Sequence, residues 1–196
     1  IPGSGFIGES KIDILNHLAG DRRIARGSLI AAAVDEDEPV MGARQFMQAE
    51  QLSYPVVLKP NEGQRGSGVL VIRSDGELED YLNRTAFDTI IQEYVAGAEF
   101  GVFYYRHPDQ SRGHIFSITE KRMPVVVGDG ARTLERLILA DERAVCMARF
   151  YLQQQGARAW DVPGAGERVQ LVELGTHCRG AIFLDGGWAK TDALER

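Results

Sequence analysis

Apolar residues recur along the chain with two different spacings. Short apolar or alternating runs bounded by turn residues are typical of strands, whereas apolar residues three and four positions apart behind a Ser or Thr cap are typical of helices. Neighbouring hairpins alternate with helices, which indicates an α+β fold rather than a doubly wound parallel sheet. The runs predict strands over residues 28–34, 56–59, 69–73, 89–95, 99–107, 114–121, 169–174 and 181–184, and helices over 10–19, 39–52 and 141–155, behind Ser74 and behind Thr133.

The segment "VVLKPNEGQRGSGVLV" (56–71) places a lysine and three glycines between two of these strands. A tight hairpin needs only two turn residues, so the longer loop needs an explanation. Glycines let a backbone approach a polyphosphate closely and turn its N–H groups toward it, and Lys59 at the strand end would add a point charge. An ordinary long hairpin loop explains the same segment, and the loop alone leaves both interpretations open.

Three other patterns have a plainer explanation than a functional one. Gly3, Gly5 and Gly8 match the G-x-G-x-x-G spacing of dinucleotide sites, but only two residues precede them and the motif needs a strand there. An ordinary loop before a helix is the preferred interpretation. The acidic run 35–38 could bind a metal, yet it fits a charged helix start. His177-Cys178 has no partner at metal-ligand or catalytic spacing, so both are interpreted as loop residues.

The segment "IIQEYVAGAEF" (90–100) reads as an apolar strand, a short bend and a glutamate that opens another strand. An extended backbone can supply the one donor and the one acceptor that read the edge of adenine, and a carboxylate a few residues on can accept from both ribose hydroxyls. Alternatively, Gln92, Glu93 and Glu99 are solvated strand residues.

Taken together, these segments resemble the ATP-grasp superfamily. "YPVVLKPNEGQRGSGV" is similar to its strand, lysine and glycine-loop signature, and "QEYVAGAEF" to its adenine and ribose hinge. Lys11 lies 48 residues before Lys59 and fits the earlier lysine of the family. "EKRMPVVVGDGARTLERLI" (120–138) resembles ligases such as cyanophycin synthetase and the ATP-grasp glutathione synthetase, and D-alanine–D-alanine ligase is another member. The resemblance covers roughly residues 9–140.

The resemblance implies a role for each matching position. Lys11 and Lys59 would contact the α- and β-phosphates, and Gly63, Gly66, Ser67 and Gly68 would form the loop that closes on the triphosphate. The backbone of Glu93 and Val95 would read adenine, with Gln92 near the amino group and Glu99 on the ribose. Lys121 would lie near the γ-phosphate, and Arg179 would contact an acyl phosphate or a substrate.

The function implied is an ATP-dependent carboxylate–amine or carboxylate–thiol ligase that acts through an acyl phosphate, with ATP and Mg²⁺ as cofactors and small carboxylates and amines as substrates. Two alternatives stay open, a small-molecule kinase and a nucleotide-binding module without turnover. The fold implied is an antiparallel sheet with a glycine-rich loop. Three domains are expected: a small α/β subdomain (1–52), the nucleotide-binding subdomain (53–122), and a helical insert with the start of a catalytic subdomain (123–196).

Composition narrows the class of protein further. The 196 residues are 44% hydrophobic and 26% charged, with a net charge of −6, as expected of a globular chain that binds neither nucleic acid nor an anionic membrane in general. The two cysteines, Cys146 and Cys178, lack disulfide or zinc spacing. No signal-peptide pattern or run of about 18 apolar residues occurs, so we expect a cytoplasmic protein. A homodimer is left open.

The ends of the sequence suggest a fragment of a longer protein. The chain opens at Ile1-Pro2, and its last residues read as the first turns of a helix. ATP-grasp members bind Mg²⁺ with an Asp and a Glu-x-Asn near the end of the domain, but no asparagine follows Asn83. We therefore expect the metal ligands beyond Arg196, and we expect these 196 residues alone not to turn over ATP.

Overall fold

The computed structural model describes residues 10–18, 20–32, 37–63 and 66–195. The chain forms two compact units, Ile1–Ala96 (unit 1) and Gly97–Arg196 (unit 2). The Gly3–Gly8 motif lies outside the described residues, as do Asp35 and Glu36 of the acidic run. The three domains expected from the sequence stay a prediction.

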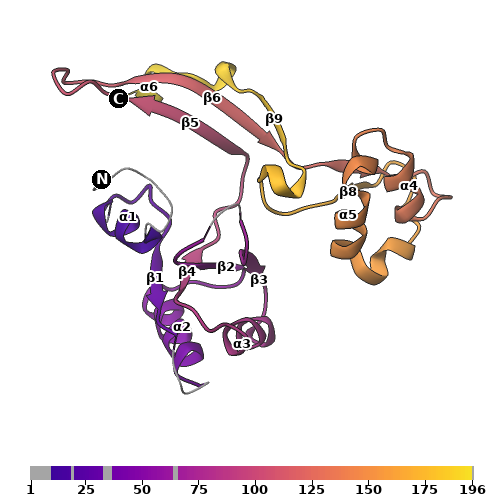
Figure 1. Cartoon of the computed structure of the whole chain (residues 1–196), viewed down its shortest axis with the longest axis horizontal. Helices are drawn as coiled ribbons and strands as arrows, with labels where there is room; N and C mark the ends of the chain where they lie inside the picture. The colour runs from indigo at the N-terminus through magenta and orange to yellow at the C-terminus, as the bar shows by residue number, and fades with distance from the viewer. Residues whose placement is uncertain (1–9, 19, 33–36, 64–65, 196) are drawn as a thin grey trace. The chain divides into compact units, whose positions relative to one another are not determined.

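Unit 1 is a four-stranded antiparallel sheet with helices (Figure 1). The strand order is β1-β4-β2-β3, and each pair is antiparallel. Strand β1, from the predicted first domain, therefore pairs with β4, from the predicted second. The elements are α1 (Lys11–His17), β1 (Gly27–Ile30), α2 (Asp37–Ala49), β2 (Val56–Pro60), β3 (Leu70–Ile72), α3 (Asp75–Asn83) and β4 (Thr89–Glu93).

The alternation of strand side chains divides this sheet into two faces. Val56, Leu58 and Ile91 belong to the core that α2 and α3 cover, and all three are completely buried. Because successive side chains point to opposite faces, Lys59 and Gln92 lie on the other face. The core beneath α2 and α3 therefore occupies one face of the sheet, while Lys59 and Gln92 lie on the other face together with the buried Ile90.

Three predicted helix caps are confirmed. The hydroxyl of Ser10 accepts from the backbone N–H of Asp13, that of Ser74 from Glu77, and that of Thr133 from Arg136. Each hydroxyl satisfies one N–H that the first turn of a helix leaves without a partner. The sequence signals for helix starts were therefore reliable here.

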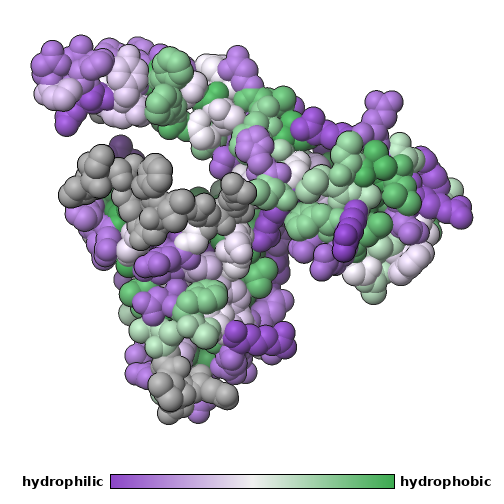
Figure 2. All heavy atoms as spheres, in the orientation of Figure 1, coloured by the Kyte–Doolittle hydropathy of each residue, from purple (hydrophilic) through white to green (hydrophobic). Residues whose placement is uncertain are grey.

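Unit 2 contains two sheets and a helical part with its own core. Strands β5 (Glu99–Tyr105), β6 (His114–Arg122) and β9 (Ile182–Asp185) form one antiparallel sheet, and β7 (Val125–Val127) pairs with β8 (Arg168–Gln170). Helices α4 (Leu134–Ala140) and α5 (Ala148–Gln155) pack around a buried Tyr151. Hydrophobic atoms are also visible on the surface over these helices (Figure 2). Short helical turns complete the unit: η1 (Ala144–Met147), η2 (Gly156–Trp160), η3 (His177–Arg179), η4 (Gly187–Ala189) and α6 (Asp192–Glu195).

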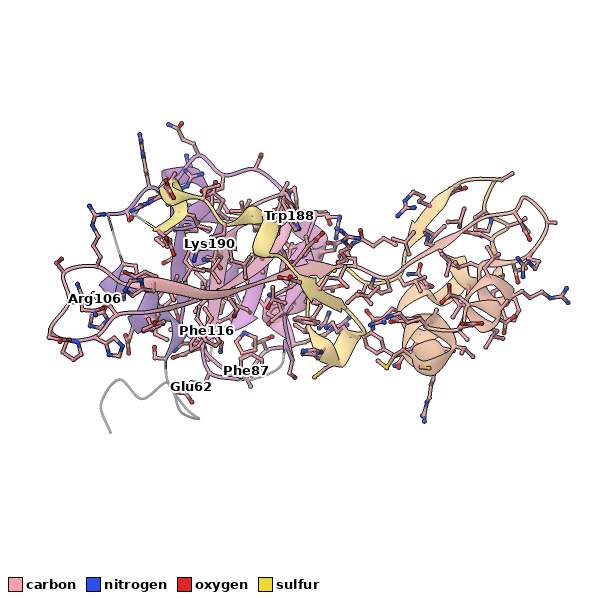
Figure 3. The ribbon with its side chains drawn as sticks, turned by 90° about the horizontal axis from the view of Figure 1, so that it is seen from above. Glu62, Phe87, Arg106, Phe116, Trp188 and Lys190 are labelled. Carbon is pink, nitrogen blue, oxygen red and sulfur yellow. The ribbon has the colours of Figure 1, made fainter. Side chains whose placement is uncertain are left out.

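The C-terminal residues of unit 2 pack against β5 and β6. Figure 3 labels Trp188 and Lys190 of this segment. The ring of Trp188 lies edge-on to Phe100, with centroids 5.6 Å apart, and its indole N–H donates to Glu120 at 3.3 Å. Lys190 donates to the carbonyl of Ile115 at 3.3 Å. This segment therefore buries part of one face of the β5–β6 hairpin.

The α+β prediction is confirmed, with local differences. Strands within 56–122 are divided between two sheets instead of one. The helix predicted over 141–155 is split into η1 and α5, because Asp141 accepts from the N–H groups of Arg143 and Ala144 and starts a tight turn. Strand β7 has only three residues and was missed. None of the helices in the described part of the chain is long and apolar enough to cross a bilayer.

Candidate functional site

Lys59 and Gln92 meet on the face of the unit 1 sheet that lies opposite the α2 and α3 core. The ammonium of Lys59 donates to Gln92 Oε1 at 2.6 Å, and Gln92 Nε2 donates to the carbonyl of Ala25 at 3.2 Å. The partner of the lysine is a neutral amide, and Lys59 makes no ion pair within the described ranges. Its charge is therefore oriented without being neutralised.

Asn61 brings Lys11 to the same end of β2. Its side-chain oxygen accepts from the N–H of Ile12 at 3.0 Å, and its carbonyl accepts from the N–H of Lys11 at 3.2 Å. The ammonium of Lys11 then donates to the carbonyls of Pro60 and Asn61 at 3.1 and 2.9 Å. Two lysines far apart in the sequence thus converge because the start of α1 is hydrogen-bonded to the residue after β2.

The pKa values of both lysines are shifted by their surroundings. Burial lowers the pKa of Lys59, and the positive charge of Lys11 lowers it further. Burial also lowers the pKa of Lys11, an effect that the carboxylate of Glu62 opposes. An anion placed between the two cations would relieve their repulsion, since opposite charge favours the protonated form of each lysine. The arrangement is suited to a phosphate group.

The described parts of the glycine loop depend on glycine. Gly63, Gly66 and Gly68 have φ values of +146°, +74° and +71°, which side chains rarely tolerate. A Cβ on Gly68 would also lie 2.7 Å from Pro60 Cγ, and the carbonyl of Gly68 accepts from the hydroxyl of Tyr81 at 2.7 Å. The loop therefore returns to the sheet at a fixed point. Gln64 and Arg65 lie outside the described residues.

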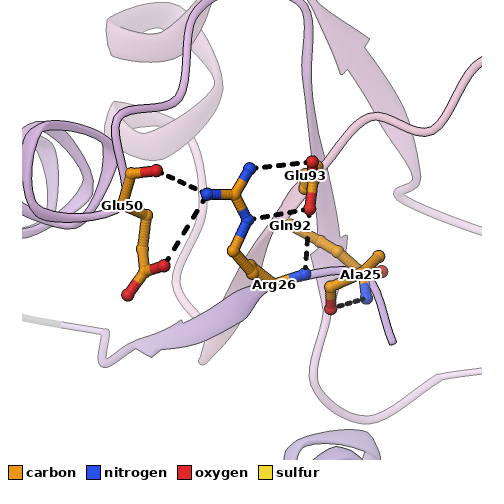
Figure 4. Close-up of polar contacts among 5 residues, drawn as sticks. All are labelled: Ala25, Arg26, Glu50, Gln92 and Glu93. Carbon is orange, nitrogen blue, oxygen red and sulfur yellow. Dashed lines mark hydrogen bonds and ion pairs between the residues drawn. The ribbon is translucent and has the colours of Figure 1, made fainter. Parts of the chain in front are cut away.

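The hinge after β4 is held by Arg26 (Figure 4). The guanidinium donates to both carboxylate oxygens of Glu93, at 2.9 and 2.8 Å, and this hydrogen bonding lowers the pKa of Glu93 to about 2. The N–H of Glu93 donates to the Arg26 carbonyl at 2.8 Å. Val95 is 68% exposed, and no group in the described segments accepts from its N–H. The carbonyl of Glu93 and the N–H of Val95 remain as the acceptor and donor expected for adenine.

Unit 2 brings two further predicted residues together. Glu99 and Lys121 are cross-strand neighbours in β5 and β6, with Glu99 Oε2 3.5 Å from Lys121 Nζ. On the other side of Lys121, Phe183 of β9 carries the ring of His177 stacked at 3.7 Å. Arg179 follows in the same short turn, η3, as His177. A lysine paired with a carboxylate has less charge available for phosphate than Lys59 has.

A cavity in unit 1 does not coincide with the lysine pair. It measures ≈ 600 Å³ and is bordered by the end of α1, residues 20–27 and the end of α2. Among the predicted residues only Glu93 lines it. Glu93 shares the face of Ile91, which the helices cover, so this cavity lies on the opposite side of the sheet from Lys59. The positions of Lys11 and Lys59 therefore identify the candidate site better than this cavity does.

A family comparison covers the central part of this site. Residues 31–101 match the model of the RimK-like ATP-grasp domain. The ATP-grasp resemblance is confirmed over these residues. The ATP-grasp match contains Lys59, the glycine loop, Gln92, Glu93, Val95 and Glu99, whereas Lys11, Lys121 and Arg179 lie outside it.

A curated protein is also similar to part of this chain. A 5-formaminoimidazole-4-carboxamide-1-(beta)-D-ribofuranosyl 5'-monophosphate synthetase of Pyrobaculum aerophilum is 37% identical over 73 residues, which are 37% of this chain and 21% of that protein. The chain therefore matches about a fifth of the length of this curated relative.

Two solved structures are similar at low identity. A bifunctional glutathione synthetase from Pasteurella multocida is 14% identical with a TM-score of 0.35, and the similarity covers 88% of this chain and 24% of that one. The VanG D-Ala:D-Ser ligase from Enterococcus faecalis is 13% identical with a TM-score of 0.38, over 79% of this chain and 49% of that one.

A metal ion would need oxygen, nitrogen or sulfur ligands from the protein, whereas a phosphate group needs positive charge and N–H donors. Across residues 10–18, 20–32, 37–63 and 66–195, no group of three or more His, Cys, Asp or Glu side chains is arranged to hold a metal ion. The described residues therefore do not form a cluster that would hold Mg²⁺ by protein ligands alone, and the position of the metal ligands stays a prediction. The positive groups around Lys59 do fit a nucleotide phosphate.

Arg26 and Asn61 are the residues that sequence reasoning missed. Neither belongs to a motif, and both act through partners far away in the chain, Glu93 for Arg26 and Ile12 for Asn61. A local pattern could not reveal such pairs. Asn61 directly follows the strand that ends in Lys59-Pro60, and this position was the one signal available.

Proposed function

We propose that this chain binds ATP through unit 1. The observation that carries the proposal is the convergence of Lys11 and Lys59, with Lys59 oriented by the neutral amide of Gln92. Burial and the positive charge of Lys11 both lower the pKa of Lys59, so an α- or β-phosphate bound beside these lysines would stabilise the charged form of Lys59. The ATP-grasp match over residues 31–101 supports the same ligand.

The remaining predicted residues have supporting roles in this proposal. The glycine loop would turn its N–H groups to the phosphates, and the Glu93 carbonyl and Val95 N–H would read adenine. Glu99 would accept from the ribose hydroxyls, while Lys121 would approach the γ-phosphate. Arg179 is the proposed contact for an acyl phosphate or a substrate.

The proposed reaction of the longer protein is ligation of a small carboxylic acid to an amine or thiol. A carboxylate oxygen attacks the γ-phosphorus and ADP leaves, which yields an acyl phosphate. The amine nitrogen or thiolate sulfur then attacks the acyl carbon, phosphate leaves, and an amine loses its proton. The groups named above contribute position and positive charge rather than covalent chemistry. Mg²⁺ would accompany the nucleotide, bound to phosphate and water.

Calorimetric titration of the 196-residue protein with ATP, ADP and adenosine tests the binding proposal. We expect ATP to bind more tightly than adenosine, because two ammonium groups contribute only when phosphates are present. Equal affinity for ATP and adenosine, or no binding of either, would contradict the proposal.

A pool of amino acids and small carboxylates, added to the longer protein with ATP and Mg²⁺, tests the reaction. Free phosphate that requires two co-substrates supports a ligase. A phosphorylated product would indicate a kinase instead, and binding without turnover would indicate a nucleotide-binding module.

A further inference from the structure

The side chain of Arg26 fixes the end of β4 to another part of unit 1 (Figure 4). Nε donates to Glu93 Oε2 at 2.9 Å and Nη2 to Glu93 Oε1 at 2.8 Å, so guanidinium and carboxylate form a two-bond fork. Nη1 donates to the carbonyl of Glu50, the residue after α2, at 2.6 Å. A single side chain thus ties the end of β4 to the end of α2.

The backbone at the same place departs from a regular antiparallel pair. In a regular hydrogen-bonded pair, two opposite residues exchange both N–H···O=C bonds. Here the N–H of Glu93 donates to the Arg26 carbonyl at 2.8 Å, but the N–H of Arg26 donates to the side-chain Oε2 of Glu93 at 3.3 Å. The Glu93 carboxylate therefore takes the place of its own carbonyl as acceptor, and this leaves the carbonyl for a different donor.

We infer that Arg26 is a positioning residue for base recognition, one that sets the preference for adenine over hypoxanthine. The inference rests on the proposed function and deepens it. Arg26 uses Nε, Nη1 and Nη2 on protein acceptors and lines the cavity on the helix-covered side of the sheet, so it acts through Glu93 without touching the nucleotide.

The chemistry of the two bases makes this inference specific. The amino group of adenine would donate to the Glu93 carbonyl, and its N1 would accept from the N–H of Val95. Hypoxanthine presents an oxygen and an N–H at these two positions, so both contacts would face a group of the wrong kind. A site built on such bonds discriminates because mismatched polar groups are left unpaired. Loosening Glu93 should weaken the bonds to adenine and leave hypoxanthine binding almost unchanged.

The test compares Arg26→Gln with the unaltered chain by titration with ATP, adenosine and inosine triphosphate. Loss of one positioned hydrogen bond corresponds to a roughly two- to tenfold loss of affinity. We expect this loss to be equal for ATP and adenosine and absent for inosine triphosphate, so that the preference for ATP falls by the same factor. A larger loss for ATP than for adenosine, or an unchanged preference, would overturn the inference.

Arg44→Gln is a matched control within unit 1. Both arginine side chains are 44% exposed, and Arg44 pairs with two carboxylates of α3, at 2.5 Å from Glu79 and 3.6 Å from Asp75. This variant should lower the melting temperature as Arg26→Gln does, while the preference for ATP over inosine triphosphate stays at the starting value. A loss of preference in both variants would assign the effect to general stability and refute a positioning role.

Two further variants separate geometry from charge. Arg26→Lys keeps the charge and loses the fork, so its preference should lie between those of the unaltered chain and Arg26→Gln; full retention would contradict the need for the fork. Glu93→Gln removes the same fork by changing the other partner, so it should show the same loss of preference for ATP over inosine triphosphate. This variant tests the inference even if Arg26→Gln does not fold. If the unaltered chain binds no nucleotide, the proposed function fails and this inference with it, whereas normal binding with unchanged selectivity in the variants refutes the inference alone.

Discussion

Replacing Lys59 by methionine removes the charge at the centre of the candidate site and keeps a stem of similar length. The ammonium of Lys59 is held 2.6 Å from a neutral amide oxygen and makes no ion pair in the described part of the chain, so its charge is available to a ligand. A hydrogen bond to a charged group contributes about 1.5–3 kcal/mol, which corresponds to a roughly 10- to 150-fold loss of ATP affinity. Adenosine carries no phosphate and should bind as before, to within about twofold by the same reasoning.

Isothermal titration calorimetry with ATP and adenosine measures both effects on the same protein. Lys190→Met is the control, because Lys190 pairs with Glu195 at 2.8 Å in unit 2 and has no proposed role. Its ATP affinity should equal that of the unaltered chain. Thermal unfolding of both variants checks that they fold. An equal loss of affinity for ATP and adenosine in Lys59→Met, or no loss for either, would refute the phosphate role of this lysine.

Three further predictions concern the ribose, the core and pH. Glu99→Ala should weaken ATP and adenosine equally, by roughly tenfold or more, because the contact is to the sugar; calorimetry showing a loss for ATP alone would contradict this. Leu78→Ala should lower the free energy of unfolding in urea by about 2–5 kcal/mol, since Leu78 is fully buried, whereas Leu70→Ala at a half-exposed site should change it by less than about 1 kcal/mol. Arg26 lowers the pKa of Glu93 to about 2 from its ordinary 4.5, so the pair stabilises the fold above pH 4.5 and the gain disappears as pH falls toward 2; urea unfolding of Glu93→Gln should show a correspondingly weaker loss of stability over that range.

Local sequence signals were sufficient for most elements of the fold. The caps Ser10, Ser74 and Thr133 predicted three helix starts, because a capping hydroxyl bonds an N–H only three residues away. The split of the predicted 141–155 helix could not be read in the same way. Asp141 is itself a capping residue, and its bonds to the next turn compete with helix continuation.

In the candidate site, too, some features follow from local sequence and others only from the tertiary structure. The sequence by itself determined the residue types and their order, a lysine at a strand end, a glycine loop and a hinge with Glu93, because each of these is a property of a few consecutive residues. Only the tertiary structure decided that Lys11 reaches the end of β2 through Asn61, that Gln92 orients Lys59, and that Arg26 holds the carboxylate of Glu93. These contacts join residues 33 to 67 positions apart. They exist because the order β1-β4-β2-β3 places distant strands side by side, and the pairing of distant strands is not encoded in any short stretch of sequence.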